Sequence, residues 1–218
     1  MSAASEPLAP LPRAFFLRPT IAVAQDLLGR YLVLARKDEA PRIGRLVETE
    51  AYLGETDLAS HAARGKTRRN APMYEEPGHA YVYFVYGMHW CLNIVTEEAG
   101  TPCAVLLRAA EPVAGLTQAA DGPGKLCRAF GLDGEWNRAD LTSGELRTTY
   151  GAPVAPDEVL ATARVGVAYA GSWAQEPLRF FVASSNCVSR SRTASPSGTL
   201  WERPAAGAKR RGRVRACP

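Results

Sequence analysis

The sequence predicts an α+β fold, a single domain built on a curved antiparallel β-sheet with helices around it. Three observations lead to this prediction. Most apolar segments have the length of a strand and are separated by turn residues. The chain shows neither internal repeats nor the regular alternation of strands and helices that accompanies a parallel sheet. Its 218 residues, 46% of them hydrophobic, suit one domain with a sizeable core.

The first expected elements are a helix and a β-hairpin. We expect Thr20 to cap the helix, because apolar residues recur at helical spacing after it until Gly29 ends the run. A strand over 31–35, a turn over 38–41 and a strand that ends at Leu53 then form an antiparallel hairpin. The later expected elements are strands over 80–86, 90–96, 103–109 and 178–183 and a helix over 124–130.

The strand that ends at Leu53 carries an unusual concentration of charge. Side chains alternate between the two faces of a strand, so Glu48, Glu50 and Tyr52 point the same way. Unpaired charge is costly to bury, and Val47 and Leu53 already supply the apolar face. We therefore expect this strand to form the floor of a functional site.

Spacing alone leaves two other interpretations of this strand open. Glu50 could form a surface ion pair with Arg45. Glu48 and Glu50 could instead act together, because residues i and i+2 of a strand lie ~6.5 Å apart, close to the carboxylate separation of glycoside hydrolases. Coupling between the two carboxylates would raise one pKa and make Glu48 a general acid.

The densest group of aromatic residues lies at 81–90, where we expect a second hairpin. Tyr81 and Tyr83 share one face of its first strand. A two-residue loop would place Asn93 on the opposite face, whereas a three-residue loop would pair Tyr81 with Asn93 and leave Tyr86 exposed at the tip. The alternatives are a buried aromatic strand and a binding element, since an exposed loop tyrosine usually has a partner.

The positive charge of the chain is unevenly distributed. It has 26 basic and 22 acidic residues, and six of the basic ones lie in the last sixteen positions. Such a tail is either an arm for nucleic acid or a solvated, disordered terminus. A second basic cluster follows His61 in a loop that contains glycine and threonine. Its members are Arg64, Lys66, Arg68 and Arg69.

Cysteine spacing and hydropathy exclude several classes of protein. The five cysteines are scattered and form no CxxC pair, so we expect reduced thiols, no disulfide framework, no metal site and no other cofactor. The first twelve residues lack the pattern of a signal peptide. No segment approaches the ~18 apolar residues of a membrane span, so no membrane association is expected.

Six sequence blocks, taken in order, closely resemble the alkyladenine (3-methyladenine) DNA glycosylase family, in its class without a helix-hairpin-helix motif. They are VETEAYLG from Val47, YVYFVYGM from Tyr81, LLRAAEP from Leu106, GKLC from Gly124, RVGV from Arg164 and PLRFFV from Pro177. The resemblance runs from about residue 15 to residue 182. It implies a single α+β domain with a DNA-binding face and a protruding hairpin that enters the minor groove.

The resemblance also implies roles for individual residues in hydrolysing the bond between a damaged purine and its sugar. Glu50 matches the general base that deprotonates a water aimed at C1′. Arg108 and the backbone carbonyl of Val165 match groups that help to hold that water. Tyr86 matches the side chain that fills the gap left by the extruded nucleotide.

The same resemblance implies a pocket for the extruded base. Tyr52, His61 and Tyr83 match walls that stack on the base, worth roughly 1–3 kcal/mol, and a cationic purine gains further by cation–π attraction. Asn93 matches a residue that would clash with the 2-amino group of guanine, which requires the three-residue loop. The expected DNA contacts outside the pocket are Met88, Lys125 at a helix start, and Arg64, Lys66, Arg68 and Arg69.

Several of these residues have plainer alternatives. His61 could be an ordinary loop residue, and Arg108 could pair with Glu48 or Glu111. For Glu48 we expect a structural role beside an arginine. The rival functional class is a damage-recognition module without catalysis, and a third is a glycoside hydrolase that uses Glu48 and Glu50.

The expected organisation is a flexible N-terminus over 1–14, a DNA glycosylase domain over 15–185 and a divergent segment over 186–218 with the basic tail. The expected partner is double-stranded DNA that contains an alkylated or deaminated purine, and the expected state is a monomer. The expected location is the cytoplasm, at the nucleoid, in a prokaryote and the nucleus in a eukaryote.

Overall fold

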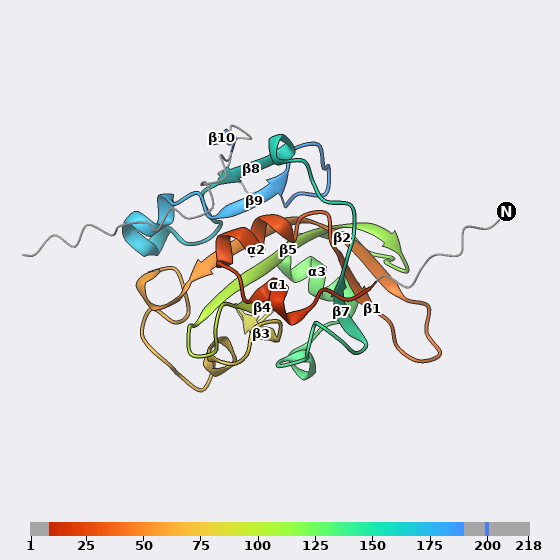
Figure 1. Cartoon of the computed structure of the whole chain (residues 1–218), viewed down its shortest axis with the longest axis horizontal. Helices are drawn as coiled ribbons and strands as arrows, with labels where there is room; N and C mark the ends of the chain where they lie inside the picture. Colours follow the sequence, from red (N-terminus) through yellow and green to blue (C-terminus); the bar gives the residue numbers. More distant parts are fainter. Residues whose placement is uncertain (1–8, 190–198, 201–218) are drawn as a thin grey trace, which may run out of the picture.

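One antiparallel β-sheet runs through the centre of the molecule (Figure 1). The computed structural model describes residues 9–189 and 199–200. Along the main path the strands follow the order β10-β8-β9-β2-β5-β4-β3, while β1, β6 and β7 pair beside it. Their bounds are β1 Tyr31–Leu34, β2 Arg42–Leu53, β3 Ala80–Val85, β4 His89–Thr96, β5 Cys103–Ala114, β6 Ala120–Asp121, β7 Leu146–Thr149, β8 Val159–Thr162, β9 Arg179–Val182 and β10 Thr199–Leu200. The predicted α+β class with an antiparallel sheet is confirmed.

Short helices pack around this sheet. The α-helices are α1 Arg13–Phe16, α2 Thr20–Asp26 and α3 Pro123–Phe130, and the 3-10 helices are η1 Gly54–Thr56, η2 Ala71–Tyr74, η3 Gly134–Trp136, η4 Pro156–Glu158 and η5 Ala168–Gln175. The α3 helix packs against β4 and β5 and is capped at its C-terminus by Gly131, which has the positive φ (+69°) that favours glycine after a helix. The α2 helix packs on β2 and β5.

The two faces of β2 have different surroundings. The Thr49 hydroxyl donates to the carbonyl of Ala24 in α2 (2.8 Å), and Val47 and Ala51 are buried in the main core. Glu48 and Glu50 alternate with these residues and therefore point to the opposite face. In this part of its length β2 is paired on both sides, with β5 and with β9. The two carboxylates therefore lie in the middle of the sheet, away from its edges.

The expected elements are present, with shifted limits. The helix that begins at Thr20 ends at Asp26, and β5 continues to Ala114. Thr20 is not the N-cap, because Pro19 holds that position and the Thr20 hydroxyl donates instead to the carboxylate of Glu97 (2.5 Å). This polar contact joins the start of α2 to the end of β4.

The hairpin of β3 and β4 has the three-residue loop. Tyr81 pairs with Asn93 and Tyr83 pairs with Cys91, so all four side chains lie on one face. Tyr86 begins the loop with a φ of +52°, in a region that non-glycine residues seldom adopt. It is 80% exposed, as expected for a residue at the tip.

Packing extends beyond the expected domain limits at both ends. Leu11 is fully buried, and its N–H donates to the carbonyl of Thr148 (2.9 Å). At the other end Ser189 is 8% exposed and contacts Glu48. The basic tail and Cys217 lie outside the described residues. Within the described part of the chain, no helix is long and apolar enough to cross a membrane.

Candidate functional site

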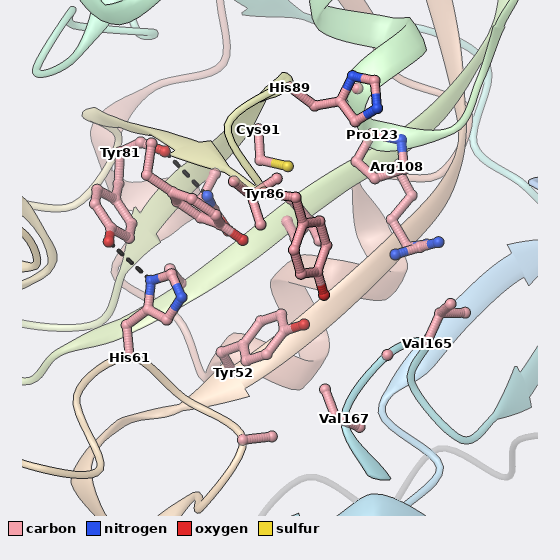
Figure 2. Close-up of a pocket in the computed structure, with 18 of the residues that line it drawn as sticks. Tyr52, His61, Tyr81, Tyr86, His89, Cys91, Arg108, Pro123, Val165 and Val167 are labelled. Carbon is pink, nitrogen blue, oxygen red and sulfur yellow. Dashed lines mark hydrogen bonds between the residues drawn. The ribbon is translucent and has the colours of Figure 1, made fainter. Parts of the chain in front are cut away.

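A cavity of about 310 Å³ opens beside the β3–β4 hairpin (Figure 2). Its size falls at the lower end of the range usual for sites that bind small molecules. Strands β2, β3, β4 and β5 form its floor and one side, and the segment over 165–169 closes the other side. The residues that line it include Tyr52, His61, Tyr81, Tyr83, Tyr86, His89, Cys91, Asn93, Leu106, Arg108, Pro123, Gly124, Val165, Val167 and Tyr169.

An aromatic cluster forms one wall of this cavity. The His61 ring lies 4.5 Å from the Tyr83 ring between centroids, and the Tyr83 ring lies 5.2 Å from that of Tyr81. His61 Nδ1 and the Tyr81 hydroxyl form a hydrogen bond of 2.9 Å (Figure 2). His61 therefore belongs to the pocket wall, as the resemblance implied, and is more than a loop residue.

The titratable groups of the wall are neutral near pH 7. Burial, with the positive charge of Arg69, lowers the pKa of His61 to about 4. Burial raises the pKa of Tyr52 and of Tyr83 well above the ordinary value, and it raises the pKa of Cys91 to about 11. The walls thus present uncharged rings and an unreactive thiol to whatever enters the cavity.

Asn93 lies at the base of this wall, on the pocket face of β4. It is 4% exposed, and its side-chain amide donates to the backbone carbonyl of Tyr81 (3.0 Å). This bond crosses from β4 to β3 and fixes the side chain against the neighbouring strand. Asn93 therefore lines the cavity, and its role in binding a base, including the clash with guanine, stays a prediction.

Glu50 lies directly behind the residues that line the cavity and is fully buried. Its carboxylate accepts a hydrogen bond from the Tyr52 hydroxyl (2.9 Å) and another from the Val165 N–H (2.8 Å). Arg108 Nη1 lies 3.3 Å from the same carboxylate. Tyr52, Val165 and Arg108 thus separate Glu50 from the cavity by one layer of atoms. It is the N–H of Val165, not its carbonyl, that contacts Glu50 in this structure.

The alternative ion pair between Glu50 and Arg45 is wrong. Arg45 Nη1 lies 3.2 Å from the carboxylate of Glu111, near the far end of the β2–β5 ladder. Arg108 instead joins the two acidic residues of β2, with its Nε 2.8 Å from Glu48 and its Nη1 toward Glu50. Burial lowers the pKa of Arg108, but Glu50 and Glu48 outweigh this effect and raise it, so the guanidinium stays charged.

Glu48 cannot be a general acid, which removes the glycoside-hydrolase interpretation. It is fully buried and does not line the cavity. Burial raises the pKa of its carboxyl, but the charges of Arg108 and Arg179 and hydrogen bonds from Ser189 outweigh burial and lower it. Glu48 therefore stays ionised, and its expected pairing with an arginine is confirmed.

Of the residues predicted to contact DNA, Tyr86 lines the cavity, and the others lie outside its lining. Tyr86 and Met88 are 80% and 67% exposed at the hairpin tip. The residues of the basic loop are all exposed, and Arg69 Nη2 donates to the carbonyl of Phe84 (2.8 Å). Lys125 lies in the first turn of α3 and pairs with Asp121 (3.0 Å). Whether these side chains bind DNA stays a prediction.

Three side chains support the site through contacts that no sequence pattern predicts, although Arg164 itself belongs to the RVGV block. Tyr169, 72% exposed, lines the mouth beside Tyr86. Arg164 lies behind Tyr52, 4.7 Å from the centre of its ring, and forms a buried, bidentate ion pair with Asp57. Ser189 reaches the buried carboxylate of Glu48 from beyond β9. Each contact joins residues far apart in the chain, and none belongs to a recognisable local pattern.

Over residues 9–189 and 199–200, no group of three or more His, Cys, Asp or Glu side chains is arranged to hold a metal ion. In the same residues the cysteines are free thiols at positions 91, 103, 127 and 187.

Comparison with known proteins gives a consistent result. Residues 14–186 match the model of the family described as methylpurine-DNA glycosylase (MPG). A protein of Myxococcus xanthus is 49% identical over 182 residues, covering 83% of this chain and 93% of that protein. One of Methanocella arvoryzae is 48% identical over 195 residues (83% and 96%), and one of Legionella pneumophila is 43% identical over 182 residues (83% and 98%). All three bear the name "Putative 3-methyladenine DNA glycosylase".

Proposed function

The chain belongs to the methylpurine-DNA glycosylase family, and from this we propose that it excises alkylated purines such as 3-methyladenine from duplex DNA. The reaction is hydrolysis of the N-glycosidic bond, which leaves an abasic site for base-excision repair. The observation that carries the proposal is the position of Glu50, which lies at the inner side of an aromatic cavity and is held by three donors. A carboxylate beside a stacking pocket is what water-mediated base removal needs.

In the proposed reaction, the extruded nucleotide places its base between Tyr52 on one side and His61 with Tyr83 on the other. A water attacks C1′ and gives a proton to Glu50, while the C1′–N bond breaks and its electron pair leaves with the base. The negative charge of the Glu50 carboxylate also stabilises the electron-poor sugar of the transition state. Arg108 orients Glu50 and, with the carbonyl of Val165, holds the water.

Access of water to Glu50 requires one local movement. In the structure the Tyr52 hydroxyl binds one carboxylate oxygen, and Val165 and Arg108 cover the other. We place the water at the oxygen that the Tyr52 hydroxyl covers, because a side-chain hydroxyl moves more easily than a backbone N–H. Stacking of the base on the Tyr52 ring turns this side chain and uncovers Glu50.

Selectivity in this proposal comes from the neutrality and the shape of the pocket. Purines alkylated at N3 or N7 carry positive charge in DNA, and a neutral His61 does not repel them. Tyrosine rings attract such a cation through their faces. Asn93 opposes the 2-amino group of guanine, so hypoxanthine, a deaminated purine without that group, also fits.

The mouth of the cavity supplies the contacts with duplex DNA. Tyr86 projects from the hairpin at the rim of the cavity (Figure 2) and fills the gap left by the extruded nucleotide. Met88 packs beside it in the minor groove, and Tyr169 covers the rim next to it. Lys125 and the basic loop over 64–69 contact phosphates. The protein acts as a monomer wherever the cell keeps its DNA, which in a prokaryote is the nucleoid.

Release of free base from a panel of lesions tests this proposal. Duplexes containing 3-methyladenine, 7-methylguanine, hypoxanthine or ethenoadenine are incubated with excess protein, and free base is measured by chromatography. The expected result is release from at least the 3-methyladenine duplex, with an abasic site left in its place. Tight binding to these duplexes without any release would instead identify a damage-recognition module.

A further inference from the structure

We propose that Glu48 is a positioning residue for base excision, which acts by fixing the guanidinium of Arg108 against Glu50. Ser189 and Arg179 hold Glu48 in place for this task. The inference rests on the proposed function, since it assigns a role in that reaction to a residue that neither touches the cavity nor titrates near neutral pH. It also brings a residue outside the matched family region, Ser189, into the support of the site.

Each nitrogen of the Arg108 guanidinium has a different partner. Nε donates to Glu48 (2.8 Å), Nη2 donates to the Ser189 hydroxyl (3.1 Å) and Nη1 lies 3.3 Å from Glu50. A guanidinium is planar, so two fixed nitrogens determine the direction of the third. Glu48 and Ser189 therefore set the direction in which Nη1 meets Glu50. Because Arg108 also lines the cavity, the same geometry fixes the charge presented to the sugar.

Both carboxylate oxygens of Glu48 accept hydrogen bonds. One of its oxygens accepts from Arg108 Nε, Arg179 Nε (2.7 Å) and the Ser189 hydroxyl (2.7 Å). The other accepts from the Ser189 N–H (2.6 Å). Donors thus surround both oxygens, and no proton-accepting role in catalysis is left for this carboxylate. Its neighbours, however, include Arg108, which also lies against Glu50.

The four charged groups balance one another inside the protein. Two carboxylates, Glu48 and Glu50, face two guanidiniums, Arg108 and Arg179, and each of the four residues is at most 6% exposed. Removing one charge from such a buried set leaves its partner uncompensated. Without Glu48, Arg108 would be free to turn its Nε toward Glu50 and would no longer hold the geometry seen here.

Glutamine at position 48 breaks this arrangement with little change in shape. Both oxygens of Glu48 accept hydrogen bonds, so the amide NH₂ of glutamine must face at least one donor. The Glu48→Gln variant therefore loses the fixed plane of Arg108 while it keeps nearly the same volume. Ser189→Ala is the milder change, since it removes only the hydroxyl that binds both Arg108 and Glu48.

A double-mutant cycle on the excision step tests the proposal. Single-turnover release of 3-methyladenine is measured for the wild type, Glu48→Gln, Arg108→Ala and the double variant. We expect Glu48→Gln to slow release by about 10–100-fold, with the dissociation constant for duplex containing an abasic analogue unchanged within about threefold. In the Arg108→Ala background the same change should slow release by less than about threefold, because its effect passes through Arg108.

A control variant and a substitute variant complete the test. Glu111→Gln is the matched control, since Glu111 is also held by an arginine and a serine, away from the cavity, and it should leave release unchanged. If Glu48→Gln does not fold, the cycle is run with Ser189→Ala, for which a smaller but equally non-additive loss is expected. The proposal would be overturned if the losses of release in Glu48→Gln and Arg108→Ala multiplied in the double variant. It would also be overturned if Glu111→Gln slowed release as much as Glu48→Gln does. Absence of release by the wild-type protein would instead refute the proposed function itself.

Discussion

Glu48 and Glu50 lie two residues apart on β2, yet their surroundings suit them to different tasks. Glu48 is enclosed by two arginines and Ser189 and does not line the cavity. Glu50 is separated from the cavity by one layer, and part of that layer is the Tyr52 hydroxyl, a group that can move. At the scale of the residue, therefore, the hydrogen-bond donors around each carboxylate, and not its position in the strand, decide which of the two can bind water.

Replacement of Tyr52 separates its two roles. Tyr52→Phe keeps the stacking ring and removes the hydroxyl that covers Glu50, so we expect excision of 3-methyladenine within about threefold of the wild-type rate constant. Tyr52→Ala removes the ring as well, and should weaken binding of lesion DNA by roughly 1–3 kcal/mol. Single-turnover release and titration with lesion duplex measure both effects. A hundredfold slower release by Tyr52→Phe would show that the hydroxyl has a direct role.

His61 should titrate far below the usual range for histidine. Its pKa in the folded protein is about 4, against 6.5 for an unperturbed histidine, because of burial and the charge of Arg69. Between these values the unfolded chain binds more protons, so His61 favours the folded state above pH 6.5, and this contribution is lost as pH falls toward 4. Titration of its ring protons by NMR checks this prediction. An inflection near pH 6.5 would contradict it, and Arg69→Ala should raise the inflection.

At the scale of the element, the β3–β4 hairpin combines a rigid base with a strained tip. The strands keep Tyr81, Tyr83, Cys91 and Asn93 on the pocket face through a regular ladder. The tip holds Tyr86 at a φ of +52° and 80% exposed. Backbone strain at an exposed aromatic residue is unfavourable for folding alone, and it is consistent with selection for a binding role.

Two substitutions at the tip distinguish strain from function. Both Tyr86→Ala and Tyr86→Gly should weaken binding to a lesion in duplex DNA, with less effect on a lesion in a single strand. The free energy of unfolding of Tyr86→Gly should be about 1 kcal/mol higher than that of Tyr86→Ala, because glycine accepts the positive φ. Fluorescence binding and denaturant unfolding supply the two measurements. Equal losses of binding on duplex and single strand would argue against a wedge.

The sequence predicted these elements well, and their long-range partners poorly. Alternation along β2 placed Glu48 and Glu50 on one face, and the aromatic hairpin left only the loop length open. Ser189 and Tyr169 could not be predicted in the same way, because their contacts depend on how distant segments pack. Arg164 belongs to the RVGV block, but its pairing with Asp57 spans more than half of the described chain and has no local signal.

At the scale of the whole molecule, buried ion pairs join the sheet to the segments that complete the cavity. Arg164 and Asp57 are both fully buried in their side chains, and Arg164 also donates to the carbonyl of Ala51 in β2 (2.8 Å). This pair ties the loop after β2 to the segment that carries Val165. The cavity wall that covers Glu50 therefore depends on it.

Breaking this pair should be costly for the fold. Asp57→Asn leaves the Arg164 charge buried without its partner, so we expect a loss of about 3–5 kcal/mol in the free energy of unfolding. The control is Glu39→Gln, which breaks only half-exposed ion pairs with Arg36 and Arg42. It should change the free energy of unfolding by less than about 0.5 kcal/mol. Urea unfolding followed by circular dichroism compares the two. Similar small losses would show that the pair is not needed to hold the segment.

The central claim, that Glu50 activates water for base removal, has one direct measurement. Glu50→Gln keeps the volume of the side chain, so the rate constant for single-turnover release of 3-methyladenine is compared with that of the wild type on the same duplex, with binding measured alongside. We predict a loss of at least about 10²-fold in release, as for other general bases, and binding of the lesion duplex within about threefold of wild type. Release by Glu50→Gln within tenfold of the wild-type rate constant would contradict the claim.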